Sequence, residues 1–317
     1  MMRDLAENSM ISAVSLSRLG VASPAGADRR IPSWASAVIS GLARDRPTVV
    51  TTEDLALRLA EADCERELES AIRELRRLGW LVRLPVQGTW AFIPPGESAV
   101  SDPYLPVRAW LARDHDAGYM LAGAAAAWHL GYLDRQPQGR ISIWLPAKKR
   151  LPDGLRPYVS VMRMSWNIKD TALLVPSTAF LVRRRLDIVS WATRLPAFGP
   201  EALLVQLAAR PSSFDPWADI VAHLELLAKD CVDERLLPLL SGQSMSTWQR
   251  ASYLIDAAGD SERGRALLAK RQREAMPSVK FSHPGIRTSG ATTGVWVPEY
   301  QLVDELVAPL LRGLGKA

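Results

Sequence analysis

The fold is decided between residues 51 and 96, where the chain has the sequence TTEDLALRLAEADCERELESAIRELRRLGWLVRLPVQGTWAFIPPG. Its first four residues, Thr51–Asp54, place hydroxyl and carboxylate oxygens just ahead of the apolar Leu55, Ala56 and Leu59. Such oxygens accept hydrogen bonds from the free N–H groups at the start of a helix. The stretch therefore predicts a short helix that ends at the polar break over residues 61–63.

A second helix is predicted from Arg66 to Leu78. Its apolar residues recur at helical spacing: Leu68, Ala71, Ile72, Leu75 and Leu78. At about 100° per residue, the opposite face carries Arg66, Ser70, Arg73 and Arg77. Gly79 ends the helix, because glycine readily adopts the left-handed conformation there.

A hairpin is predicted next, with strands over residues 80–84 and 89–93 and a turn over residues 85–88. Upstream, the apolar spacing from Trp34 to Leu42 predicts a first helix, which ends near Pro47, and Val49-Val50 predicts a short strand. Helices followed by a hairpin in this order indicate a winged helix-turn-helix, a shape suited to the major groove of duplex DNA.

The residues expected to contact DNA follow from this fold. They are Arg66, Ser70, Arg73, Arg77, Thr52, Arg83, Gln87 and Thr89. An arginine can donate two hydrogen bonds to guanine, worth about 1–3 kcal/mol of discrimination. The alternative is a solvated helix face with a Glu69–Arg73 pair worth about 0.2–0.5 kcal/mol and a turn that any hairpin needs.

Composition indicates a soluble globular protein of two domains, with 317 residues, 48% hydrophobic and 23% charged. The pI of about 9.4 suggests an acidic partner. Residues 31–100 nevertheless hold 8 Lys and Arg against 10 Asp and Glu, so the excess positive charge lies in the second half. No apolar stretch approaches the length of a membrane span. The two cysteines, Cys64 and Cys231, lack metal-ligand spacing, and we expect a reducing cytoplasmic location.

Three segments are predicted along the chain: a mobile tail over residues 1–30, the winged helix-turn-helix over 31–97, and a larger helix-rich α+β domain over 98–317. The fold class is therefore α+β. In the last domain we expect helices over residues 104–113, 119–130, 200–209, 217–229, 246–257, 262–275 and 300–311, and strands over 141–145, 158–162 and 295–297.

Two basic clusters of that domain are candidates for binding a partner or nucleic acid. They are Lys148, Lys149 and Arg150, and Arg183, Arg184 and Arg185. A solvated loop or strand end explains them equally well. Asp114-His115-Asp116 lacks the phosphate loop and preceding strand of a nucleotidyltransferase metal site. We therefore predict no metal, no cofactor and no catalytic residue.

Residues 119–133, YMLAGAAAAWHLGYL, an isoleucine-rich strand and Leu145-Pro146 follow the winged helix and its Pro/Gly break. From about residue 31 to its end, the chain resembles the AbiEi-type antitoxins of abortive-infection toxin–antitoxin systems, in their mycobacterial-type branch. The resemblance implies a non-enzymatic antitoxin. Its N-terminal domain would bind inverted repeats in double-stranded operator DNA and repress its own operon. Its C-terminal domain would counter a cognate nucleotidyltransferase toxin. The alternative is a stand-alone winged-helix transcription regulator whose C-terminal domain senses a ligand or partner.

Overall fold

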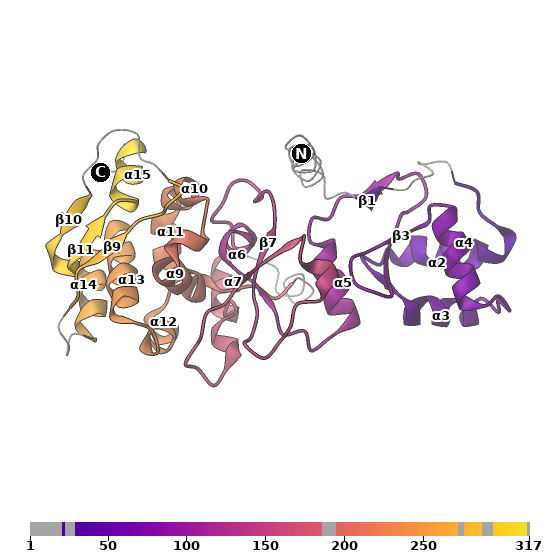
Figure 1. The fold of residues 1–317 in the computed structure, drawn as a ribbon, viewed down its shortest axis with the longest axis horizontal. Helices are drawn as coiled ribbons and strands as arrows, with labels where there is room; N and C mark the ends of the chain where they lie inside the picture. The colour runs from indigo at the N-terminus through magenta and orange to yellow at the C-terminus, as the bar shows by residue number, and fades with distance from the viewer. Residues whose placement is uncertain (1–20, 23–28, 186–194, 272–275, 287–293, 316–317) are drawn as a thin grey trace, which may run out of the picture. The chain divides into compact units, whose positions relative to one another are not determined.

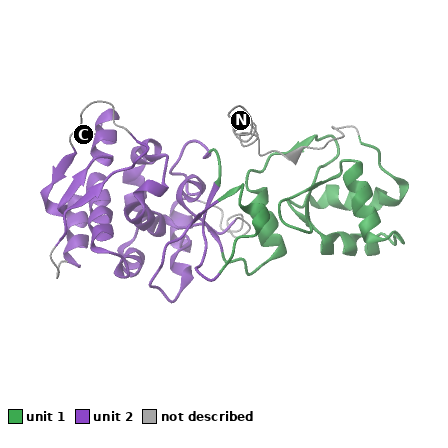
Figure 2. Cartoon of the chain, in the orientation of Figure 1, with its two compact units in different colours: residues 1–118, 138–140, 149–159 green, residues 119–137, 141–148, 160–317 purple. Residues whose placement is uncertain are grey.

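The computed structural model describes residues 21–22, 29–185, 195–271, 276–286 and 294–315 (Figure 1). Most of the tail expected over residues 1–30 lies outside the described residues. Contacts divide the chain into two compact units (Figure 2). Unit 1 comprises residues 1–118, 138–140 and 149–159, and unit 2 comprises residues 119–137, 141–148 and 160–317. This division groups residues 98–118 with the N-terminal part, and the boundary expected after residue 97 stays a prediction.

Unit 1 has the element order of a winged helix, and the α+β class is confirmed. Its elements are the 3-10 helix η1 (Ser33–Ala35), α2 (Ser36–Asp45), β2 (Val50–Thr51), α3 (Thr52–Glu61), α4 (Leu68–Arg77), β3 (Leu81–Arg83), β4 (Thr89–Phe92), β5 (Ala99–Val100) and α5 (Leu105–Arg113). β4 is the central strand of an antiparallel sheet of order β2-β4-β3. β1 (Val21–Ala22) pairs antiparallel with β5.

Local chemistry explains where helix α3 begins. Thr51 is the N-cap of α3: its hydroxyl accepts from the backbone N–H of Asp54 at 3.1 Å, and its own N–H donates to the Asp54 carboxylate at 2.9 Å. This reciprocal pair is a capping box. The buried faces of the three helices close on the sheet in one apolar core, which includes Leu42, Leu55, Leu75 and Phe92.

Unit 2 contains the remaining helices and two three-stranded sheets within the described residues. Its helices are α6 (Gly123–His129), α7 (Thr178–Arg183), α9 (Pro200–Ala209), α10 (Trp217–Ala222), α11 (Leu224–Asp230), α12 (Asp233–Ser241), α13 (Met245–Ala257), α14 (Ser261–Ala269) and α15 (Val307–Gly313), with the short 3-10 helices η3 (Thr171–Leu173), η4 (Pro211–Ser213) and η5 (Pro298–Tyr300). One sheet has the order β6 (Met120–Leu121), β7 (Ile141–Trp144), β8 (Val159–Met162), and the other β10 (Val295–Val297), β11 (Leu302–Asp304), β9 (Val279–Phe281). β8 begins at Val159, the last residue of unit 1.

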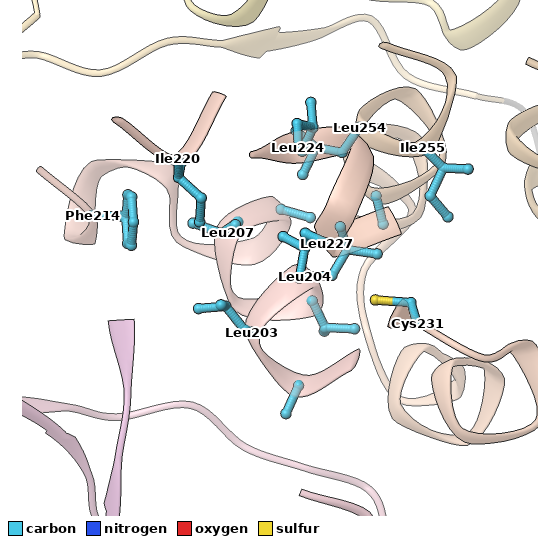
Figure 3. Packing of buried hydrophobic residues seen from close by; sticks show 14 of the residues in the cluster. Leu203, Leu204, Leu207, Phe214, Ile220, Leu224, Leu227, Cys231, Leu254 and Ile255 are labelled. Atoms are coloured by element: carbon cyan, nitrogen blue, oxygen red, sulfur yellow. The ribbon is translucent and has the colours of Figure 1, made fainter. Parts of the chain in front are cut away.

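Helix α9 lies at the centre of the unit 2 core. Every residue from Pro200 to Ala208 is buried, including the polar Glu201 and Gln206, as expected for a helix in the interior of a domain. Leu207 of α9 lies beside Ile220 of α10, and Leu204 lies beside Leu227 of α11 (Figure 3). At the start of α6, the N–H of Gly123 donates to Gln206 of α9 at 2.8 Å, so the alanine-rich helix is tied to this core.

Several expected elements of unit 2 were wrong in detail. Residues 120–121 form a strand instead of the first turn of a helix, and the helix expected over 217–229 divides at His223. Helix α12 and strand β9 were not expected. The closing helix expected over 300–311 is strand β11 followed by α15. None of the described helices combines the length and apolar character that crossing a membrane requires.

Candidate nucleic-acid interface

Helix α4 has the buried and exposed faces that its sequence predicts. Ala71 and Leu75 are buried in the unit 1 core, whereas Arg73 and Arg77 are exposed. Ser70 is half-buried. Packing of Ala71 and Leu75 into the core holds helix α4 in place, so the arginines on its opposite side have defined positions.

Arg66 does not lie on this helix, which begins at Leu68 with Glu67 as its N-cap. The Arg66 guanidinium is 2.6 Å from the Glu74 carboxylate and 4.6 Å from the centre of the Trp34 ring. These contacts hold Arg66 against its own domain. The proposed interface below therefore leaves Arg66 out.

A groove of about 490 Å³ runs between the C-terminal half of α4 and strand β3. Its walls consist of Arg73, Arg76, Arg77, Leu81, Val82 and Arg83. Arg77 lies 3.8 Å from Glu74, while Arg73, Arg76 and Arg83 form no hydrogen bond or ion pair with any residue that the structure describes. Four guanidinium groups around one hollow create a positive potential that attracts an anion such as phosphate.

Arg76 is the residue of this groove that sequence reasoning missed. It follows Arg73 by three positions, which places the two on neighbouring parts of a helix surface. Its place in the groove follows only from the structure, in which β3 packs beside α4 and contributes Arg83 to the other wall. The sequence carried a signal in the pair Arg76-Arg77, but not the position of the strand.

The other predicted DNA contacts are Thr52 at the start of α3 and three residues in or beside the wing turn, and only some of them are accessible. The Thr52 hydroxyl donates to the Gly88 carbonyl at 3.3 Å, which ties α3 to the turn. Thr89 is 0% exposed and its hydroxyl donates to the Val86 carbonyl at 2.6 Å. A side chain buried in this way cannot contact DNA, so Thr89 is removed from the candidate interface. Arg83 and Gln87 are exposed.

In the second basic cluster, Arg183 and Arg184 form ion pairs with the buried Asp230. Asp230 is buried and accepts from the Tyr132 hydroxyl at 2.8 Å. The guanidinium groups of Arg183 and Arg184 lie 3.4 and 3.6 Å from its carboxylate. Neutralising a buried carboxylate accounts for both arginines without any partner. Arg185 is exposed.

The first cluster starts a long loop between β7 and β8. Lys148 and Arg150 are exposed, and the Lys149 amino group donates to the Asp116 carbonyl. Asp114 accepts from the backbone N–H of Asp116 at 3.0 Å, which is a local turn contact. Among the described residues, no three His, Cys, Asp or Glu side chains gather as a metal site would require.

Comparison with known proteins places these features in context. The family model described as AbiEi antitoxin C-terminal domain matches residues 116–257. The crystal structure of the RV2827C protein from Mycobacterium tuberculosis is similar over 94% of this chain and 100% of that chain, with 69% sequence identity and a TM-score of 0.85. No curated protein matches the chain.

Proposed function

Because the chain belongs to the AbiEi antitoxin family, we propose that it neutralises a cognate nucleotidyltransferase-type toxin and represses its own operon by binding inverted repeats in the promoter. Its partners are then double-stranded operator DNA and the toxin, and its location is the cytoplasm. The match over residues 116–257 supports the antitoxin role. The proposed activity requires no cofactor and no catalytic residue.

The arginine groove beside the exposed face of α4 carries the DNA-binding half of this proposal. Arg73 is exposed and lies about midway along α4, so we assign it to a base edge in the major groove. Arg76, Arg77 and Arg83 line the groove towards the wing, so we assign them to phosphates. Residues 31–100 are not basic overall, which makes this local concentration of charge the decisive feature.

A binding experiment with the DNA upstream of the gene tests the repressor role. Arg73→Ala is expected to weaken binding to the specific duplex by about 1–3 kcal/mol and to relax its specificity. Arg76→Ala and Arg83→Ala are expected to weaken binding to all duplexes and to reduce the salt slope by about 1 each.

Arg44→Ala is the matched control, because Arg44 is an arginine of the same unit with an 81% exposed side chain on another helix. Its affinity is expected to equal that of the wild type. Equal binding by the wild type and Arg73→Ala at raised salt would contradict base recognition by α4.

Co-expression with the product of the neighbouring gene tests the antitoxin role. We expect the chain to restore growth that the neighbouring protein arrests. Operator binding without this rescue would favour a stand-alone transcription regulator, and would remove the antitoxin part of the proposal.

A further inference from the structure

The wing turn is not a free hairpin tip, because a loop from further along the chain packs against it. Residues 149–158 lie between β7 and β8 in the sequence, yet they belong to the same compact unit as the winged helix (Figure 2). The 3-10 helix η2 (Asp153–Leu155) is the part of this loop that reaches the wing.

Gly154 makes the contact through its backbone. A Cβ atom added to Gly154 would lie 2.1 Å from the carbonyl oxygen of Pro85 and 3.2 Å from its carbonyl carbon. The first distance is far below van der Waals contact, and the opposing atoms belong to the main chain, which cannot rotate away. Glycine is therefore the residue that lets η2 rest directly on the wing turn.

Apolar side chains on both sides of this contact are buried. Leu155, next to Gly154, is 0% exposed, and Val86, next to Pro85, is 7% exposed. Leu84 of the wing is buried as well, although neither Leu84 nor Val86 is part of the core under α2, α3 and α4. Their burial favours apolar packing between the wing turn and the β7–β8 loop.

The wing needs such support for a simple physical reason. Its turn extends beyond a sheet in which β2 and β4 form two residue pairs and β3 and β4 form three. The turn residues 85–88 form none of these strand pairs, and a segment with few backbone pairings opens more readily than the sheet it joins. The β7–β8 loop joins two strands of another three-stranded sheet, and its contact at Gly154 gives the wing turn a main-chain neighbour.

We propose that the β7–β8 loop positions the wing for DNA, with Gly154 and Leu155 as positioning residues that do not touch the duplex. This inference rests on the operator binding proposed above. It means that part of the DNA-binding apparatus is encoded more than 50 residues after the wing, within the stretch that matches the antitoxin C-terminal domain.

The test compares two variants of the full chain with two matched controls. Gly154→Ala introduces the colliding Cβ, and Leu155→Ala removes buried contact without a backbone collision. Gly313→Ala adds a methyl group where nothing lies within 4 Å, and Leu314→Ala truncates a leucine that is 46% exposed. Amide hydrogen exchange over residues 84–92 without DNA measures the order of the wing, and titration with the operator duplex measures affinity.

Both test variants are expected to exchange faster over residues 84–92, to bind the operator about tenfold more weakly, and to show a salt slope reduced by about 1. Partial unfolding would lower the fraction of active protein without altering this slope, so the slope separates positioning from instability. Unchanged exchange over residues 84–92, or wild-type affinity and slope in both variants, would overturn the inference while leaving operator binding intact. Failure of the wild type to bind would overturn the proposed repressor instead, whatever the exchange shows.

Discussion

The buried carboxylate of Asp230 provides the sharpest test of how unit 2 is held together. Its side chain is 4% exposed and faces Tyr132, Arg183 and Arg184. Burial, followed by the neighbouring Cys231 and Asp230, raises the pKa of the Tyr132 hydroxyl, which therefore remains a proton donor throughout the physiological range. Replacing Asp230 by alanine leaves that buried donor without its acceptor.

The loss of unfolding free energy in Asp230→Ala can be worked out from the interactions that Tyr132, Arg183 and Arg184 lose. An unsatisfied buried hydroxyl costs about 1–3 kcal/mol. The arginines lose less than a fully buried pair would, because their side chains are 43% and 24% exposed and water can solvate them. Arg183 also keeps its hydrogen bond to the main-chain oxygen of residue 230 at 2.9 Å. We therefore expect Asp230→Ala to destabilise unit 2 by about 2–4 kcal/mol.

Chemical denaturation followed by circular dichroism measures this loss. Asp230→Asn should cost about 1 kcal/mol, because the amide oxygen still accepts from Tyr132. Asp219→Ala, which removes an exposed aspartate on α10, should stay within about 0.5 kcal/mol of the wild type. A double-mutant cycle between Asp230→Asn and Tyr132→Phe should reveal coupling. A cost below about 0.5 kcal/mol for Asp230→Ala would refute the reasoning and make Arg183 and Arg184 available for a ligand.

Three further outcomes are expected. Thr51→Ala removes the N-cap of α3 and should destabilise unit 1 by about 1 kcal/mol in denaturation, with Thr48→Ala as an exposed control in the same unit. Arg29→Ala removes hydrogen bonds to the carbonyls of Ile93 and Pro94 and a cation–π contact with Trp80. It should lower the free energy of unfolding by about 1–2 kcal/mol and shift the tryptophan emission. An unchanged emission spectrum would argue against the contact with Trp80. Burial raises the pKa of Glu201 above its ordinary 4.5, so its stability contribution is present below pH 4.5 and is lost as the pH rises through the folded-state pKa. Glu201→Gln should therefore flatten the fall in unfolding free energy above pH 4.5, and identical pH profiles would contradict this.

The winged helix was predictable because its determinants are local. The capping box at Thr51 and the apolar spacing of α4 each lie within one element, and both appear in the structure as expected. The fold of unit 2 was harder to predict, because its short strands are stabilised by residues that are far away in the sequence. β11 pairs with β9 and β10, and the buried Asp304 carboxylate accepts from Tyr253 and from the first N–H groups of α15. A helical spacing across that region cannot reveal contacts to a side chain 51 residues away.

The candidate interface likewise contains some residues that local sequence patterns predicted and others that they did not. Helical spacing identified Arg73 and Arg77 as exposed, because exposure on an amphipathic helix follows from the core positions beside it. The hairpin pattern predicted Thr89 as a contact, but this side chain is buried and its hydroxyl donates to a turn carbonyl. Helical spacing placed Arg66 on the helix, whereas Arg66 is exposed but precedes it. It also missed Arg76, whose significance depends on a strand that packs beside the helix.

The discontinuous make-up of unit 1 has a consequence for biosynthesis. Residues 31–97 are translated first, but the segment that packs on Pro85 ends only at residue 159. At a synthesis rate of about 5–20 residues per second, roughly 3 to 12 s separate the two on the ribosome. During that interval the contact between Gly154 and Pro85 cannot form, so the turn of the nascent hairpin stays accessible to a chaperone or to a second nascent chain.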